Sequence, residues 1–295
     1  MKAMSSLQDL RCMSFNIKNA YDMEGVNGWE RRKDMVAGMI RIHRADIIGI
    51  QEAFHTQIQD MEARLPEYKW VGVGRDDGKQ EGEYACIFYL ADRLELLETG
   101  SFWLSEQPDV PGSRGWDAAC NRVATWAKFR DKLSEQTFFH LNTHFDHIGM
   151  VAIEESAKLI LRRVHEAAAA DLPIVITGDF NCTSDSSPYR VLTGQQSYDD
   201  VPDLKLRDAE GAAQYHHIGP TFTFHGFDMQ TLAAQMFPQI VEQSSPEGLE
   251  FDSPIDFIFI SDNVQVKSYA ILADHVLGLC PSDHFPIIAD ISFQA

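Results

Sequence analysis

The chain has 295 residues, of which 44 are acidic and 25 are Lys or Arg, so its formal net charge is −19. Hydrophobic residues make up 44% and charged residues 23%, a profile typical of a globular protein rather than of a disordered or fibrous one. The acidic excess argues against a protein that coats nucleic acid through its overall charge, because such binding needs a broad basic surface. It does not exclude a nucleic-acid enzyme whose cleft is locally basic or is filled by bound cations.

The cysteines and the first residues indicate the cellular compartment. The five cysteines are odd in number and no two have CxxC spacing, so we expect neither a disulfide framework nor a zinc knuckle. Residues 1–10 lack the apolar core of a signal peptide, and no apolar run approaches the roughly 20 residues that cross a bilayer. We therefore expect a cytoplasmic protein without membrane insertion, and the sequence indicates no protein partner.

Short β-type runs, many of them rich in Val, Ile and Phe, recur along the whole chain and are bounded by Gly, Asp, Asn or Pro. The expected strands are Arg11–Ile17, Ile47–Gln51, Trp70–Val73, Ala85–Tyr89, Glu95–Glu98, Thr125–Arg130, Thr137–Thr143, Ile174–Thr177, Phe257–Ile260, Val264–Ile271 and Ile287–Phe293. Strands outnumber helices, and helices do not follow every strand. This pattern favours mixed sheets over a strictly alternating doubly wound fold.

Helical spacing of apolar residues predicts three helices between these strands. They are Glu30–His43, which carries Met35, Met39, Ile40 and Ile42, the short Thr56–Leu65, and the longer Val151–Ala170. The last has Ile153, Ala157, Ile160, Leu161 and Val164 on one face. The proline-rich region Thr183–Glu250 is expected to form loops around short elements, although Thr221–Phe224 alternates like a strand. No linker divides the chain.

Four clusters join an apolar strand to polar residues of catalytic type. They are Met13-Ser14-Phe15-Asn16, Ile48-Gly49-Ile50-Gln51-Glu52, Ile174-Val175-Ile176-Thr177-Gly178-Asp179-Phe180-Asn181 and Ser282-Asp283-His284-Phe285-Pro286. Taken singly, each polar residue is more commonly a turn residue or a solvated side chain. Taken together, they place oxygen donors at several strand ends, where active sites tend to lie. Hard oxygen ligands suit Mg²⁺ or Mn²⁺.

Two histidines stand in a similar context. His144 follows an apolar run, and His284 lies near the end of the chain, so each is a candidate general acid or base or metal ligand. Such an imidazole needs a carboxylate to fix its tautomer and stabilise its charged form. Glu83 and Asp256 are the candidates, because each begins an apolar strand where an unpaired charge is costly. His147 is a candidate supporting partner, and His216 and His217 are interpreted as loop residues.

Six motifs in this order resemble the endonuclease/exonuclease/phosphatase superfamily. They are Ser14-Phe15-Asn16, Gln51-Glu52, Thr143-His144, Gly178-Asp179-Phe180-Asn181, Ile255-Asp256-Phe257-Ile258 and Ser282-Asp283-His284. The segments around Tyr84–Tyr89, Trp103 and Trp126 look like an uncharacterised bacterial branch. The resemblance implies a DNase I-like, four-layer α/β sandwich, in which two mixed β-sheets pack face to face with helices outside. It also implies a single catalytic domain over residues 1–295.

The resemblance implies a role for each candidate residue. Glu52, with Asn16 and Asp283, would hold Mg²⁺ or Mn²⁺. Asp179 and Asn181 would hold or activate the attacking water, with His284 and Asp256 as the acid/base pair. His144 resembles the second active-site histidine, Glu83 its carboxylate partner and Arg122 an arginine that contacts phosphate. The carboxylates are expected to raise the pKa of both histidines.

These features predict a divalent-metal-dependent phosphoesterase that hydrolyses a phosphodiester or phosphomonoester by in-line attack of an activated water. The alternative is a nuclease acting on single-stranded or short nucleic acid. A third function, a non-catalytic binding protein of the same fold, would be expected if a metal or histidine position were missing, and none is. The loops Gly74–Gly82, Trp103–Ala119 and Thr183–Glu250 are expected to select the substrate. In them, Trp103 and Trp116 either stack on a ligand or anchor the loop.

Overall fold

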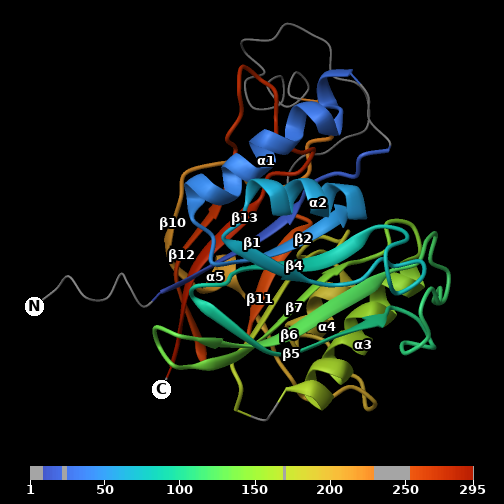
Figure 1. Cartoon of the computed structure of the whole chain (residues 1–295). Helices are drawn as coiled ribbons and strands as arrows, with labels where there is room; N and C mark the ends of the chain where they lie inside the picture. Colours follow the sequence, from blue (N-terminus) through green and yellow to red (C-terminus); the bar gives the residue numbers. More distant parts are fainter. Residues whose placement is uncertain (1–8, 22–24, 169–170, 229–252, 295) are drawn as a thin grey trace, which may run out of the picture.

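The strands form two mixed β-sheets that pack face to face, and helices cover their outer faces (Figure 1). The computed structural model describes residues 9–21, 25–168, 171–228 and 253–294. The strand order is β10-β12-β13-β1-β2-β4-β3 in one sheet and β5-β6-β7-β8-β11-β9 in the other. The expected four-layer α/β sandwich is therefore confirmed.

The first sheet consists of β1 (Leu10–Asn16), β2 (Ile47–Ala53), β3 (Tyr68–Val71), β4 (Tyr84–Leu90), β10 (Ala213–His216), β12 (Val264–Ile271) and β13 (Ile287–Phe293). The second consists of β5 (Leu94–Trp103), β6 (Val123–Asp131), β7 (Thr137–His144), β8 (Ile174–Asp179), β9 (Arg207–Asp208) and β11 (Asp256–Ile260). The helices are η2 (Gly25–Asn27), α1 (Trp29–His43), α2 (His55–Arg64), α3 (Met150–Ala167), α4 (Ser187–Leu192) and α5 (Ala209–Ala212). No helix in the described part of the chain has the length and apolar character needed to cross a membrane.

Most expected elements are present, with differences at irregular positions. The expected strand Glu95–Glu98 is longer in the structure, where β5 continues to Trp103. A register shift between Leu96 and Glu98 interrupts the alternation of side chains, but the pairing with β6 goes on beyond it. Thr221–Phe224 forms only an isolated bridge from Phe224 to His284 instead of a strand. Short elements β9, β10, α4 and α5 escaped prediction because two to six residues carry too little periodicity. Residues 229–250 of the expected loop region lie outside the described residues.

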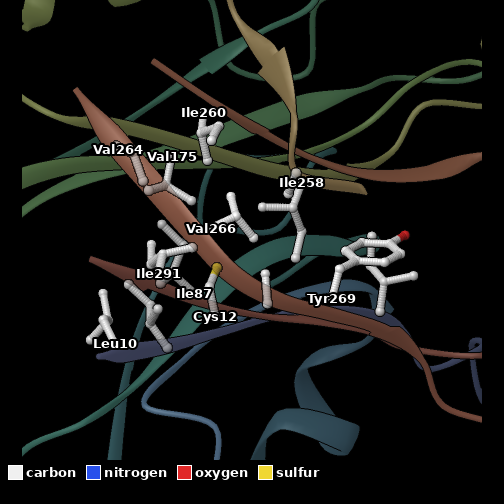
Figure 2. Packing of buried hydrophobic residues seen from close by; sticks show 14 of the residues in the cluster. Leu10, Cys12, Ile87, Val175, Ile258, Ile260, Val264, Val266, Tyr269 and Ile291 are labelled. Atoms are coloured by element: carbon white, nitrogen blue, oxygen red, sulfur yellow. The ribbon is translucent and has the colours of Figure 1, made fainter. Parts of the chain in front are cut away.

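Three large apolar clusters among the described residues hold the layers together. Figure 2 shows the cluster between the sheets, where Cys12 and Ile87 of one sheet point toward Val175 and Ile258 of the other. A second cluster lies between α1, α2 and the outer face of β1 and β2, and a third lies between α3, α4 and the outer face of β7, β8 and β11. The predicted apolar face of α3 is buried as expected. On α1, however, Ile42 is 75% exposed because it points away from the sheet.

The inward faces of the central strands change character along their length. Alternate residues of a strand point to the same face. From the apolar end toward the polar end, the inward positions read Leu10, Cys12, Ser14, Asn16 in β1; Ile47, Gly49, Gln51 in β2; Phe138, His140, Asn142, His144 in β7; Val175, Thr177, Asp179 in β8; and Ile260, Ile258, Asp256 in β11. Hydrophobic packing therefore stabilises one end of the sandwich, and the opposite end carries the candidate site.

A buried hydrogen-bond network joins the two sheets just beneath the polar end. Asn142 of β7 donates through Nδ2 to the backbone carbonyls of Ile50 and Cys86 in the opposite sheet, at 2.9 Å each. Its Oδ1 accepts from Gln51 at 2.6 Å and from Thr177 at 3.1 Å. Gly49 has no side chain here because a Cβ would lie 2.1 Å from Oγ1 of Thr177. Close approach of the sheets at this level thus depends on glycine.

Candidate active site

Strand pairing brings His144, Asp179 and Asp256 side by side at the polar end of the sandwich. In the parallel pair of β7 and β8, His144 lies opposite Asp179, and in the antiparallel pair of β8 and β11, Asp256 lies opposite Asp179. Because all three face the interior of the sandwich, their side chains converge. The register thus explains why residues more than a hundred positions apart in the chain meet.

Asp179 lies at the centre of this group. Its Oδ2 accepts from Nδ2 of Asn16 at 2.9 Å and lies 3.4 Å from Nε2 of His144 and 3.7 Å from Nε2 of His284. Burial and the neighbouring Asp256 raise the pKa of Asp179 above its usual range. A carboxylate held among these donors, with a raised proton affinity, is suited to accept a proton.

His284 forms the expected pair with Asp256, and the contact is confirmed by a distance of 2.8 Å between Nδ1 and Oδ2. Burial lowers the pKa of His284, but Asp256 and Asp179 outweigh that effect and raise the pKa to about 10. The imidazole is therefore protonated at neutral pH. It presents Nε2–H toward Asp179 and the cleft, where it can donate to an anion.

A β-bulge aims Glu52 into the cleft. Between the pairs Ile50–Cys86 and Ala53–Tyr84, β2 contains one more residue than β4, and Glu52 has a left-handed φ of 66°. Bulges commonly redirect a side chain next to an active site, and a left-handed non-glycine residue is a strained one. The strain is maintained by hydrogen bonds to Glu52 from Nδ2 of Asn16 at 3.0 Å and from the backbone and side chain of Asn19 at 3.1 Å.

The ammonium group of Lys18 lies between two carboxylates, 3.7 Å from Oε2 of Glu52 and 3.7 Å from Oδ2 of Asp283. Burial raises the pKa of Glu52, but Lys18 and Asn16 bring it below its usual value, whereas burial keeps the pKa of Asp283 raised. A cation between two oxygen donors shows that this space suits positive charge. The donor set fits a hard divalent cation. We call Glu52, Asp283 and Lys18 the carboxylate side of the cleft.

Asn16 itself lies beneath the cleft, fully buried. Its amide nitrogen donates to Glu52 and Asp179, and its Oδ1 accepts from the backbone of Lys18 at 3.0 Å. In this arrangement Asn16 links the two carboxylates and fixes the start of the loop after β1. Its predicted role as a metal ligand stays a prediction.

Arg32 of α1 clamps the loops of the carboxylate side from below. Its guanidinium is fully buried and donates to the backbone carbonyls of Asn27, Ile17, Pro281 and Lys18, at distances from 2.6 to 3.1 Å. Pro281 immediately precedes Ser282 and Asp283, so one side chain holds the loops that carry Lys18 and Asp283. Burial lowers the pKa of Arg32 to about 10, against the effects of Asp283 and Glu52, and it remains charged at neutral pH.

Another part of the cleft lining consists of Arg75, Arg122 and His147, which we call the guanidinium side. Nη2 of Arg122 lies 3.0 Å from Nδ1 of His147, and its Nε lies 3.7 Å from Oδ2 of Asp146. Arg75 comes from the loop between β3 and β4 and lines the same cleft. Two guanidinium groups facing one cleft are suited to bind phosphate.

The expected pair of Glu83 with His144 is not found among the described residues. Glu83 forms an ion pair with Arg75 instead and accepts a 3.4 Å hydrogen bond from Asn19. The backbone of Arg75 pairs with that of Glu83 at 3.0 Å, so the hairpin loop itself brings the guanidinium to this carboxylate. Burial, opposed by Arg75, raises the pKa of Glu83 to about 7.

The pKa of His144 also differs from the expectation. Burial lowers it well below the usual value, and the positive charges of Arg122 and Arg75 lower it further. His144 is therefore neutral, in contrast to the charged His284. The prediction of a raised pKa is wrong for His144 because burial, and after it the nearby arginines, disfavour the charged imidazole, and no paired glutamate offsets them.

The lining residues enclose a cleft of about 510 Å³. They include the predicted residues Glu52, Glu83, Arg122, His144, Asp179, Asn181, Asp283 and His284. Asn181 has a left-handed φ of 46° and donates to the carbonyl of Phe145 at 3.0 Å, which turns the chain after β8. Asp256 and Asn16 support this set from beneath.

Sequence reasoning missed several lining residues, namely Lys18, Asn19, Arg75, Cys120, Phe224 and Ile255. Lys18 and Asn19 follow Asn16 directly, so polar residues just after a strand could have indicated them. Arg75 and Phe224 lie in loops that were expected to select the substrate, but nothing in the neighbouring sequence singled out these two residues. Trp103 is buried and donates to the carbonyl of Arg75, and Trp116 packs against the α3 cluster, so both anchor their loop.

The sequence model of a family described as the Endonuclease/Exonuclease/phosphatase family matches residues 13–284. An endonuclease/exonuclease/phosphatase from Bacteroides vulgatus is 41% identical, with a TM-score of 0.83 over 97% of this chain and 99% of that one. A mannosyl-6-phosphatase from Bacteroides thetaiotaomicron is 36% identical, with a TM-score of 0.80 over 96% of this chain and 100% of that one.

A more distant relative is the CCR4-Not complex 3'-5'-exoribonuclease subunit Ccr4 of Coccidioides immitis. It is 22% identical over 343 aligned residues, which cover 90% of this chain but 44% of the relative. This chain thus spans less than half of that protein.

Proposed function

Because the chain belongs to the endonuclease/exonuclease/phosphatase family, we propose that it is a divalent-metal-dependent phosphatase that hydrolyses the phosphomonoester of a sugar. The observation that carries the proposal is the convergence of Asp179, His144 and His284 in a cleft lined by two arginines. The likeness to a mannosyl-6-phosphatase, at 36% identity over nearly all of both chains, supports a sugar phosphate as substrate.

The chain's own residues divide the work of in-line hydrolysis. Asp179 accepts the proton of the attacking water, and Asn181 helps to hold that water. His284, kept protonated by Asp256, donates from Nε2 to an oxygen of the phosphate as negative charge shifts in the transition state. Arg122 and Arg75 bind the remaining phosphate oxygens and orient the ester for attack along the axis of the leaving oxygen.

The metal would be held by Glu52 and Asp283, with Asn16 fixing the orientation of Glu52. When bound, a divalent cation would neutralise the negative charge of the phosphate and of the departing oxygen. Lys18 already places one positive charge in contact distance of both carboxylates. Its side chain would therefore have to move aside or share the site, so that metal affinity depends on Lys18 as well as on the acidic residues.

A nuclease acting on single-stranded or short nucleic acid is the second candidate function. The likeness to an exoribonuclease subunit favours it, since the alignment covers 90% of this chain. The formal charge of −19 counts against tight binding of a long polyanion. A non-catalytic binding protein is disfavoured, because each predicted metal and histidine position is occupied by the expected residue type.

A substrate panel tests the proposal. The purified chain is assayed with Mg²⁺ and with Mn²⁺ on mannose 6-phosphate, p-nitrophenyl phosphate, bis-p-nitrophenyl phosphate, and single-stranded RNA and DNA, with Asp179→Ala as the inactive control. We expect release of inorganic phosphate from the monoesters, abolished by EDTA and by the variant. Preferential cleavage of the oligonucleotides or of the diester would refute the phosphatase in favour of the second candidate.

A further inference from the structure

The contact between Arg122 and His147 determines where His147 carries its proton. Nη2 of Arg122 lies 3.0 Å from Nδ1 of His147. Arginine has only hydrogen-bond donors, so Nδ1 must be the acceptor and cannot itself be protonated. In the neutral imidazole the hydrogen then resides on Nε2. The contact therefore leaves a single donor on His147, on the nitrogen that faces away from Arg122.

The turn that carries His147 is held rigidly. The preceding residue, Asp146, is fully buried, and its Oδ1 accepts from the backbone of Ile148 at 3.0 Å and of Gly149 at 2.8 Å. Its Oδ2 accepts from the backbone of Ala119 at 3.0 Å and of Cys120 at 3.3 Å. Asp146 thus ties the turn before α3 to the loop before β6, and His147 extends from a fixed support.

The outward nitrogen of His147 has no protein partner. Among the residues that the structure describes, no hydrogen bond or ion pair involves Nε2, although the side chain lines the cleft and is exposed. The donor is thus oriented by its neighbours and available to a ligand. Because Arg122 faces the same cleft, a ligand whose phosphate binds to Arg122 places its adjoining group near His147.

We propose that His147 is a substrate-binding residue whose Nε2–H donates to a hydroxyl or ring oxygen of the sugar beside the phosphate. This inference rests on the proposed function and deepens it, because it assigns a residue to the recognition of the part of the substrate that leaves. A sugar offers several acceptor oxygens close to its phosphate ester. An aryl phosphate offers none, so the two substrates separate recognition of the sugar from recognition of the phosphate.

Two substitutions at position 147 separate its contact with Arg122 from its contact with substrate. In His147→Asn, the amide oxygen can replace Nδ1 as the acceptor for Arg122, but the side chain is too short to donate from the position of Nε2. In His147→Gln, the amide nitrogen reaches that position and can donate. His165→Asn, at an exposed histidine in the last turn of α3, is the matched control.

The kcat and KM of each variant are measured with mannose 6-phosphate and with p-nitrophenyl phosphate in Mg²⁺. We expect His147→Asn to raise the KM for mannose 6-phosphate about tenfold, with kcat and the KM for p-nitrophenyl phosphate changed less than about twofold. His147→Gln recovers most of the lost affinity, and His165→Asn behaves as the wild type. Circular dichroism and thermal unfolding check that the variants are folded.

Other outcomes overturn the inference or the function on which it rests. An equal rise of KM for both substrates would mean that His147 acts only through Arg122, and no change for either would mean that it contacts no substrate. Both results overturn the inference while the phosphatase function stands. A wild type that hydrolyses p-nitrophenyl phosphate but not mannose 6-phosphate refutes the sugar substrate and the inference together. Inactivity toward both refutes the phosphatase itself.

Discussion

On the carboxylate side Glu52 lies within β2 and Asp283 lies in the loop before β13, whereas Arg75 and His147 on the guanidinium side both lie in loops. A bulge in β2 and the clamp of Arg32 position the carboxylates. Hydrogen bonds between loops position the guanidinium side, such as those from Ala119 to Asp146 and from Asn121 to Asp76. The carboxylate side thus depends on an irregularity within a strand and on one buried arginine, and the guanidinium side depends on contacts between loops.

This difference suggests that the two sides have different roles in the reaction. Residues fixed by strand pairing tolerate little change, so they are suited to steps common to every substrate. Residues on loops can vary with the loop while the sheets stay the same, and loops on a rigid scaffold commonly carry specificity. We therefore expect variants of the carboxylate side to lower kcat on all substrates, and variants of the guanidinium side to change KM and the ranking of substrates.

The largest effect is expected at Asp179, which stands between the two sides. Asp179→Asn keeps the size of the side chain but removes its charge and proton affinity, so kcat should fall by about 10²–10⁴-fold on every substrate. Steady-state kinetics measure the change, and Asp203→Asn, at an exposed carboxylate, serves as the control. Activity of Asp179→Asn at the wild-type level would refute its role as the proton acceptor.

Glu52→Gln tests the carboxylate side alone. Loss of one carboxylate should weaken binding of Mn²⁺ by at least about 100-fold and lower kcat at low metal concentration, with partial recovery at high concentration. Isothermal titration calorimetry measures the binding, and kinetics measure the recovery. If the variant keeps the affinity of the wild type, the metal lies elsewhere in the cleft.

Arg122→Lys tests the guanidinium side. Lysine keeps the charge but lacks the planar, bidentate donor geometry of the guanidinium, so KM should rise about tenfold with a smaller change in kcat. The comparison of sugar and aryl phosphates reports whether the ranking of substrates changes as well. A loss of kcat without a change in KM would mean that Arg122 takes part in the steps common to every substrate. It would then contradict the proposal that the guanidinium side determines KM and the ranking of substrates.

Gly49→Ala tests the close packing of the two sheets beneath both sides of the cleft. A Cβ at position 49 would lie 2.3 Å from Oδ1 of Asn142, so the sheets must separate, and the free energy of unfolding should fall by about 1–3 kcal/mol. Urea denaturation measures the effect. Gly38→Ala in α1, where a Cβ meets no atom within 4 Å, is the control and should be neutral or stabilising by up to about 1 kcal/mol. Equal stability of the two variants would contradict close packing at Gly49.

The most gradual effect is expected for the pH dependence of stability. Burial lowers the pKa of His140 from 6.5 to about 3. Between these values the unfolded chain binds a proton at this position and the folded chain does not, so stability falls as pH falls, by up to about 1.4 kcal/mol per pH unit. His140→Gln should have a shallower slope between pH 6 and pH 4, roughly the middle of that range. His165→Gln, at an exposed site, should keep the slope of the wild type.

The site residues at strand ends could be predicted from the sequence, because an apolar run and the polar residue at its end are both visible within a few consecutive positions. Asn16, Asp179 and Asp256 each end or begin a strand, and the register brings them together. The partner of Glu83 could not be predicted in this way. Its contact with Arg75 depends on the path of a hairpin loop. The lowered pKa of His144 was missed because it follows mainly from burial, with Arg122 and Arg75 adding to it. Arg32 was missed because a polar residue on a buried helix face has no distinctive spacing.

Asn142 has a consequence for how the molecule moves. Its amide group bonds to backbone carbonyls of two adjacent strands in the opposite sheet. Sliding of one sheet over the other would break these bonds in a buried setting, where unsatisfied polar groups are costly. We therefore expect the two sheets to keep their relative position during turnover. Amide hydrogen exchange should accordingly be slow at Ile50 and Cys86.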